Sequence, residues 1–459
     1  MSATEELANF LVETSYEAMH PEAIEVAKEA MLDCLGTMLA GSKEPAAKVL
    51  ISFLKSLRGE PQAGVIGWGF KTSVPNAALA NGTMAHVLDY DDVSVMGHPT
   101  TTLLPALLVL GEKVKASGKD IIEAYILAFE VATRCAEAVG LGPRRLGFHP
   151  TAIMGTIGAG AAAAKLLRLN VEKTRMTLGL AASNACGMGK NRGTMTKSFH
   201  AGNAARGGVV AAMLINEGYT AIPDIMETPF GFIHAFSASE EYDIKKLTEN
   251  LGKTFKVVSP GITIKKYPTC SVTHSAIDAM LHLIKDYNIS PEELDSVEVE
   301  VIPIAMNILT YIDPINSLQG KFSMNFTLAV ALQEHNVGLK QVTDEKVNHP
   351  KIKELMKKIK MIPRTGEPEV SPESIGIVES PTTVRVRFLD GKECSHRVAK
   401  PRGSPDNPLS WQELSVKYRE CAGLVLKGEE IERSLKIMEN LEELRDISEL
   451  VEAVKGKEG

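Results

Sequence analysis

The sequence contains no Cys-x-x-Cys pair, and its six cysteines lie far apart along the chain. Zinc ribbons and redox dithiols both need closely paired cysteines, so the sequence supports neither kind of site. A cysteine outside such a pair behaves mostly as a small apolar residue. We therefore expect most of these side chains to be buried: Cys34, Cys135, Cys186, Cys270, Cys394 and Cys421.

An excess of basic residues and long apolar runs are also missing. The 50 Lys and Arg are outnumbered by 57 Asp and Glu, which gives a formal net charge of −7 and argues against nucleic-acid binding. No apolar run reaches the length of a membrane span, so no membrane partner is expected. The acidic, amphipathic N-terminal segment resembles neither a signal nor a transit peptide, and a cytoplasmic location is expected by default.

Helical periodicity dominates the chain up to about residue 260. The pattern then changes: residues 296–303 alternate apolar and polar side chains, and residues 382–398 predict a hairpin that turns at Asp390-Gly391. From Ser410 the pattern is helical again. The sequence therefore predicts a mainly α fold, with an all-helical domain (1–264) interrupted by a smaller α+β lid domain (265–398) and completed by C-terminal helices (399–459).

Residues 81–99, NGTMAHVLDYDDVSVMGHP, concentrate ionisable side chains between two apolar runs. Such groups are costly to desolvate, so they seldom cluster in apolar sequence without partners or a task. The segment has neither the H-E-x-x-H spacing of a zinc site nor the glycine and terminal glutamate of a calcium loop, and we assign no metal. We expect Asp89 and His98 to act chemically, Asp91 and Asp92 to fix the loop, and His86 to pack.

Other polar groups stand in Gly-rich loops among apolar helices. His149 precedes Pro150 at a predicted helix start, and a basic loop contains Lys190, Arg192, Lys197 and His200. The chain lacks G-x-S-x-G and the Gly-rich phosphate motifs, which argues against a serine nucleophile and a nucleotide site.

The remaining side chains suit acid–base chemistry on an anion without a cofactor. Histidines move protons near neutral pH, and His98 and His149 are the candidates. Lysine and arginine pair with carboxylates. The cations that can hold a carboxylate substrate are Lys197, Lys265, Lys266 and Arg192.

Several motifs, in the same order along the chain, resemble the MmgE/PrpD family: NGTMAHVLDYDD…GHP, LGFHPTAIMGTIGAGAAAAKLL, GTMTKSFHAGNAARGG, IKKYPTCSVTHSAIDA and GSPDNPLSWQEL. This family includes 2-methylcitrate dehydratase, cis-aconitate decarboxylase and iminodisuccinate epimerase. The resemblance implies a large helical domain, a smaller lid, a homodimer and no obligatory cofactor. It also implies the active-site residues Asp89, His98, His149, Lys197 and Lys265. We further expect Arg192, His200, Lys266 and Cys270 to bind the substrate.

Two positions depart from the decarboxylase branch of the family. Val93 stands where that branch has threonine, and Cys270 stands where it has histidine. The loop between the acidic motif and His98 is also shorter. The D-Y-D-D-V motif departs from the dehydratase branch too, because that branch has an asparagine in the motif and a Thr-Trp pair after it.

These features favour a hydro-lyase acting on a di- or tricarboxylic acid, through removal of an α-proton and loss of water. The alternative is an epimerase or isomerase of a substituted succinate such as iminodisuccinate, which would use the same side chains. A cis-aconitate decarboxylase ranks lower, as does a non-catalytic binding protein built on the same fold. The lid (about residues 265–396) is expected to close over residues 89–99, because Lys265 lies at the predicted domain junction, where hinges occur.

Overall fold

The computed structural model of the chain describes residues 1–237, 242–365 and 381–457. It divides into two compact units. The helical unit contains residues 1–190, 196–262 and 410–459, and the mixed unit contains residues 191–195 and 263–409. The mainly α fold predicted from the sequence is confirmed. No helix in the described parts of the chain has the length and apolar character needed to cross a membrane.

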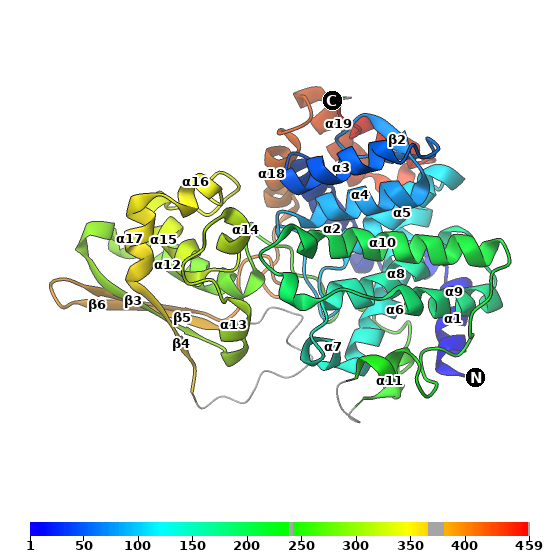
Figure 1. Cartoon of the computed structure of the whole chain (residues 1–459), viewed down its shortest axis with the longest axis horizontal. Coiled ribbons are helices and arrows are strands. Elements are labelled where there is room, and N and C mark those ends of the chain that lie inside the picture. Colours follow the sequence, from blue (N-terminus) through cyan, green and yellow to red (C-terminus); the bar gives the residue numbers. More distant parts are fainter. Residues whose placement is uncertain (238–241, 366–380, 458–459) are drawn as a thin grey trace. The chain divides into compact units, whose positions relative to one another are not determined.

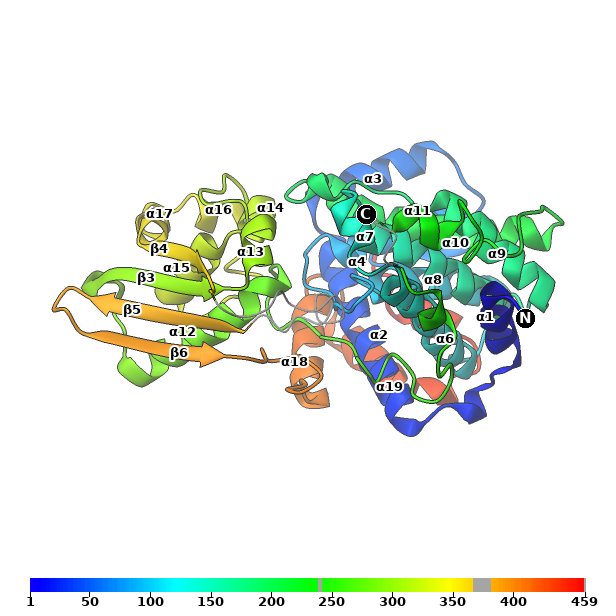
Figure 2. The same cartoon turned by 90° about the horizontal axis from the view of Figure 1, so that it is seen from below.

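The helical unit is built around α6, a helix that is buried along almost its whole length and packs against α8 (Figures 1 and 2). Its one sheet among the described residues is the short antiparallel pair β1 (Ala63–Val65) and β2 (Phe70–Thr72). Its main helices are α1 (Ala3–Glu13), α2 (Pro21–Gly41), α3 (Pro45–Ser56), α4 (Val74–His86), α5 (Thr100–Val114), α6 (Gly118–Val139), α7 (Gly142–Arg145), α8 (Pro150–Leu166), α9 (Val171–Asn184), α10 (Met195–Asn216), α11 (Phe232–Phe236), α18 (Trp411–Ala422), α19 (Gly428–Glu439) and α20 (Ser448–Ala453).

Small residues let α10 approach two neighbouring helices closely. A Cβ atom on Gly202 would lie 2.2 Å from the Leu79 carbonyl oxygen of α4. One on Gly208 would lie 2.3 Å from the Gly160 backbone nitrogen of α8. Glycine at these crossings therefore fixes the distance of α10 from α4 and α8, and α10 carries two of the predicted site residues, Lys197 and His200.

We expect Gly202→Ala to destabilise the chain by about 1–3 kcal/mol, because the added methyl group would press on backbone atoms that cannot rotate away. Gly428→Ala is the matched control, since a Cβ there meets nothing within 4 Å. Urea unfolding followed by circular dichroism measures both. Equal midpoints for the two variants would show that α10 can move away at no cost.

The mixed unit contains a four-stranded sheet in the order β4-β3-β5-β6. β3 (Leu294–Val301) pairs in parallel with β4 (Ile359–Pro363) and antiparallel with β5 (Thr382–Phe388), which continues into β6 (Glu393–Val398). The predicted 382–398 hairpin is therefore confirmed. The longer helices α12 (His274–Tyr287), α15 (Met324–Glu334) and α17 (Pro350–Lys357) pack with the sheet around one apolar core, and α13 (Pro303–Ile308), α14 (Ser317–Gly320) and α16 (Asp344–Val347) are short.

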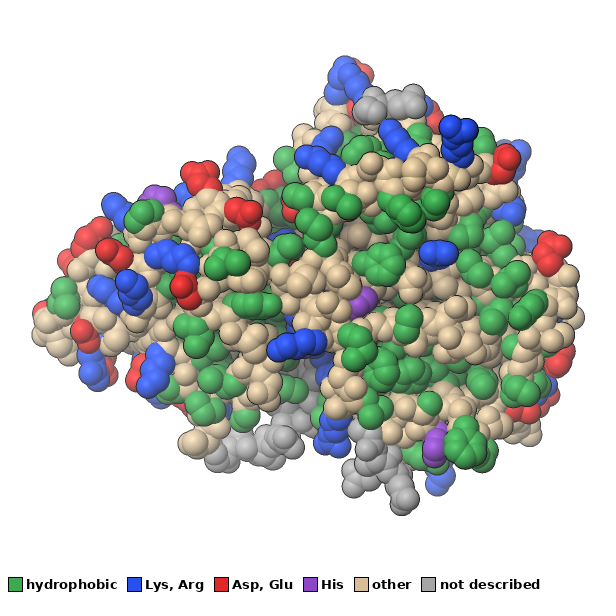
Figure 3. Space-filling model, in the orientation of Figure 1, with side chains coloured by type: hydrophobic (Ala, Val, Ile, Leu, Met, Phe, Trp, Pro, Cys, Tyr) green, Lys and Arg blue, Asp and Glu red, His purple; other side chains and the backbone are tan. Residues whose placement is uncertain are grey.

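Hydrophobic side chains also lie on the surface of the helical unit, including the side that contains α10 (Figure 3). Phe199 and Leu214 of α10 are exposed, and so is Tyr219 just after it. Val49 and Phe53 of α3 and Leu57, the residue just after it, are all more than half exposed. Their spacing of four residues places these three side chains on one face of the helix.

Candidate active site

The chain between α4 and α5 turns sharply and is almost entirely buried. Asp89 adopts a φ of +53°, an uncommon conformation for a residue other than glycine. Asp92 fixes the start of α5, because its carboxyl group accepts hydrogen bonds from the backbone N–H and the hydroxyl group of Thr100. The predicted loop-fixing role of Asp92 agrees with these contacts.

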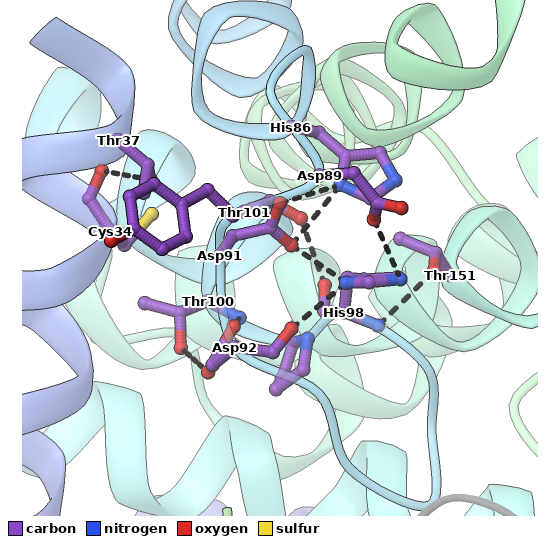
Figure 4. Close-up of polar contacts among 12 residues, drawn as sticks. Cys34, Thr37, His86, Asp89, Asp91, Asp92, His98, Thr100, Thr101 and Thr151 are labelled. Atoms are coloured by element: carbon purple, nitrogen blue, oxygen red, sulfur yellow. Dashed lines mark hydrogen bonds and ion pairs between the residues drawn. The ribbon is translucent and has the colours of Figure 1, made fainter. Parts of the chain in front are cut away.

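Asp91 connects two histidine side chains (Figure 4). Its oxygens lie 3.0 and 3.1 Å from Nδ1 of His86, and Oδ2 lies 2.7 Å from Nδ1 of His98. Nδ1 of His98 also lies 2.9 Å from the Asp92 carbonyl oxygen. Because these oxygens only accept hydrogen bonds, each imidazole carries its proton on Nδ1 and leaves Nε2 as an acceptor.

Lys197 of α10 lies against the other side of His86. Its Nζ is 2.7 Å from His86 Nε2 and 3.0 Å from Asp89 Oδ1. Nε2 of His98 is 3.9 Å from the same Asp89 oxygen. A carboxylate, an ammonium group and two imidazole nitrogens thus meet in one buried place.

His149 and His200 form a second pair beside this group. His149 precedes α8, where its backbone N–H donates to the Gly187 carbonyl oxygen, and its Nδ1 is 3.2 Å from Nδ1 of His200. The ring centre of His149 is 5.9 Å from that of His86 and 6.3 Å from that of His98. The histidines therefore form one continuous cluster.

Burial controls the protonation of this cluster. Burial lowers the pKa of His86 to about 3, an effect that Asp91 opposes and Lys197 reinforces. Burial, followed by the charge of Lys197, lowers the pKa of His200 to about 4 and holds the pKa of His149 well below its usual value. Burial would raise the pKa of Asp91, but its contacts with His86 and His98 keep that pKa well below the usual range. Near neutral pH the site therefore holds an ionised Asp91 and neutral His86, His149 and His200.

Acid should destabilise the fold through these histidines. The unfolded chain takes up protons on imidazole below about pH 6.5, whereas folded His86 stays neutral down to a pKa of about 3. The contribution of these histidines to stability is therefore complete above about pH 6.5 and is lost as the pH falls below it. At about pH 5.5 we expect a loss of about 1 kcal/mol for each of His86 and His149.

Urea unfolding at about pH 7.5 and about pH 5.5 measures this loss of stability. Asp91 does not contribute in this window, because an unfolded aspartate titrates only near pH 3.9. His149→Asn should lose about 1 kcal/mol less than the unmodified chain between the two pH values. Asp92, whose pKa is raised by burial, changes stability in the opposite direction in both proteins, so the difference between the two proteins is the decisive quantity. An equal change of the unfolding free energy in both proteins between the two pH values would contradict a buried neutral His149.

The predicted residues of the mixed unit occupy varied surroundings. Lys265 is completely buried, and the backbone N–H of Cys270 donates to the Lys321 carbonyl oxygen at 2.9 Å. Nζ of Lys266 lies 3.7 Å from Asp278. The carbonyl oxygen of Arg192 accepts a hydrogen bond from Tyr311. That Lys265, Lys266, Cys270 and Arg192 join the histidine cluster stays a prediction.

His86 and Asp91 make more contacts within the site than the sequence predicts. His86 does not only pack, because it contacts both Asp91 and Lys197, and Asp91 orients two imidazoles rather than one loop. His86, Asp89, Asp91 and His98 also have ligand atoms within 4.8 Å of one another, as do His86, His98 and His149. Neither group has the residue spacing of a known metal-binding motif, so ligand spacing in the sequence identifies neither.

Sequence comparison identifies the family of the chain. The sequence model of the MmgE/PrpD N-terminal domain matches residues 5–245, and that of the MmgE/PrpD C-terminal domain matches residues 267–443. The chain belongs to the MmgE/PrpD family. Individual members of the MmgE/PrpD family match over nearly the whole chain.

Three such relatives are cis-aconitate decarboxylases. The mouse protein is 27% identical over 472 residues, which cover 99% of this chain and 94% of the relative. The human protein is 27% identical over 99% of this chain and 95% of its own length. The protein from Aspergillus terreus is 27% identical over 98% of this chain and 95% of its own length. All three relatives are named for decarboxylation of cis-aconitate. This is the activity that ranks lower for this chain on the basis of Val93 and Cys270.

Proposed function

We propose that this MmgE/PrpD chain is an acid–base lyase that acts on a di- or tricarboxylic acid without a cofactor. The observation that carries the proposal is the contact of Asp91 with Nδ1 of His98 at 2.7 Å. It leaves Nε2 of His98 as a proton acceptor, beside the buried ammonium group of Lys197. A base next to a fixed cation suits removal of a proton α to a carboxylate, where negative charge develops on the carboxylate oxygens.

In the proposed dehydration, Lys197 pairs with a substrate carboxylate, and Nε2 of His98 takes the α-proton. The electron pair of the broken C–H bond forms the new C=C bond, and the hydroxyl group on the neighbouring carbon leaves. His149, supported by His200, gives that hydroxyl group a proton, so that it leaves as water. A polycarboxylate near His149 would raise the pKa of His149, because negative charge stabilises the imidazolium form. Binding of the substrate would thus favour the protonated His149 that acts as the acid.

Dehydration is the preferred reaction because it uses both an acceptor and a donor of protons. The ring centres of His98 and His149 are 6.3 Å apart, which leaves the two imidazoles available for different atoms of one substrate. Decarboxylation of cis-aconitate is the second candidate, and the names of the relatives favour it. Epimerisation of a substituted succinate would use the same two histidines and lose no group.

Incubation of the purified chain with 2-methylcitrate, cis-aconitate and iminodisuccinate in heavy water, followed by NMR, separates these reactions. Dehydration produces an alkene from 2-methylcitrate. Decarboxylation releases carbon dioxide from cis-aconitate. Uptake of deuterium with no new alkene and no carbon dioxide would overturn the lyase proposal in favour of an epimerase. Binding of these acids with no turnover and no exchange would favour a binding protein.

A homodimer is the proposed assembly. The exposed apolar side chains of α3 and α10 support it, because soluble monomers rarely expose large contiguous apolar patches. Sedimentation equilibrium of the unmodified chain and of Phe53→Glu tests this assignment. We expect the charge to weaken the dimer if α3 lies in the interface. A monomer at every concentration of the unmodified chain would exclude the dimer.

A further inference from the structure

The contacts of His86 and His98 resemble those of metal-bound histidines. Such histidines usually donate Nδ1–H to a carboxylate or carbonyl oxygen, which orients Nε2 toward the ion. Here Asp91 supplies that carboxylate to both rings, and the Asp92 carbonyl oxygen supplies a further acceptor to His98. An outer support for two ligating imidazoles is therefore already in place.

The atoms that these rings present lie close together. Nε2 of His98 is 3.9 Å from Asp89 Oδ1, and one ammonium group contacts both Asp89 Oδ1 and Nε2 of His86. Two imidazole nitrogens and a carboxylate are ligands that zinc and related divalent ions accept. The His98 side chain is 12% exposed, so the group is not sealed from solvent.

The Nζ of Lys197 occupies the place that an ion would take. It lies 2.7 Å from His86 Nε2 and 3.0 Å from Asp89 Oδ1, in contact with two of the three ligand atoms. Without a cation, this site would contain only groups that accept hydrogen bonds or bind cations. The protonated lysine supplies that positive charge. The side chain therefore balances the charge of Asp89 and blocks the ion at once.

We propose that Nε2 of His86, Nε2 of His98 and Oδ1 of Asp89 form a latent site for a divalent transition-metal ion, which the ammonium group of Lys197 normally fills. An ion of the zinc class would bind only by displacing Lys197. It would then cover the proposed base, so the metal acts as an inhibitor and not as a cofactor. The binding itself does not depend on the proposed lyase activity.

Titration of the full chain with Co²⁺, followed by its visible absorption, and with Zn²⁺ by calorimetry, tests the site. Lys197→Ala should bind both ions at least about tenfold more tightly than the unmodified chain, because the competing cation is gone. Lys197→Ala combined with His98→Asn should lose at least about tenfold of that affinity, since asparagine cannot supply the Nε2 ligand. Lys197→Ala combined with His282→Gln is the matched control, because His282 lies on α12 and is not one of the proposed ligands. This double variant should bind both ions as tightly as Lys197→Ala does.

The proposal fails if Lys197→Ala binds Co²⁺ no better than the unmodified chain, or if adding His98→Asn leaves the affinity unchanged. Lys197→Met, with an uncharged side chain of similar length, replaces Lys197→Ala in every arm if the alanine variant does not fold. These measurements contain no substrate. A wrong assignment of the lyase reaction would therefore leave the metal result intact, and a failed metal titration would leave the lyase proposal standing.

Discussion

His98→Asn should lower kcat by about 10²- to 10⁴-fold, with little change in the free energy of unfolding. The asparagine amide nitrogen can take the place of Nδ1 and still donate to Asp91 Oδ2, which lies 2.7 Å from Nδ1 in the unmodified chain. What the substitution removes is Nε2, the proposed proton acceptor. The variant thus separates the loss of a base from the loss of a structural contact.

Steady-state kinetics with the acid that the chain converts, together with urea unfolding, measures both properties of this variant. His282→Gln is a suitable control, because this histidine is about half exposed and contacts Asp286 and the ring of His396 on the mixed unit. It should leave kcat and stability unchanged. A kcat within tenfold of the unmodified value for His98→Asn would assign the base to another residue, with His149 as the first alternative.

Local sequence signals predict much of the fold. Pro21 begins α2 and Gly41 ends it, as the preferences of these residues for helix ends indicate. Ser410 and Glu413 form the predicted capping box at the start of α18. The short β1–β2 pair is not predicted, because its three-residue strands are too short to show an alternating pattern.

The site is only partly predictable, because its contacts join segments that are distant in the sequence. Asp89 and His98 are identified by their clustering and by the family motif. The contact between Lys197 and His86 spans 111 positions and depends on the close crossing of α4 and α10 at Gly202. The bridging role of Asp91 depends on the turn at Asp89, whose positive φ has no sequence signal of the kind that glycine provides.

Asp91→Asn should lower kcat by about 10²-fold or more, although the side chain keeps its shape. Asparagine has one oxygen to accept a hydrogen bond. Its NH₂ group would face Nδ1 of His86 from the position of Oδ1, and Nδ1 of both His86 and His98 from the position of Oδ2. A histidine that faces this NH₂ group has to carry its proton on Nε2. If it is His98, the base can no longer accept a proton. If it is His86, its Nε2–H points at the Lys197 ammonium group, whose Nζ lies only 2.7 Å away.

Asp92→Asn is the matched control for this prediction, because Asp92 is the neighbour of Asp91 and the pKa values of the two are shifted in opposite directions. Burial raises the pKa of Asp92 well above its usual range, so its carboxyl group is already neutral and an amide resembles it closely. Its side chain bonds Thr100, and only its backbone carbonyl contacts His98. We therefore expect kcat to fall in Asp91→Asn and to persist in Asp92→Asn, with similar unfolding midpoints. Equal activity in both variants would show that the tautomers of His86 and His98 are set by something other than Asp91.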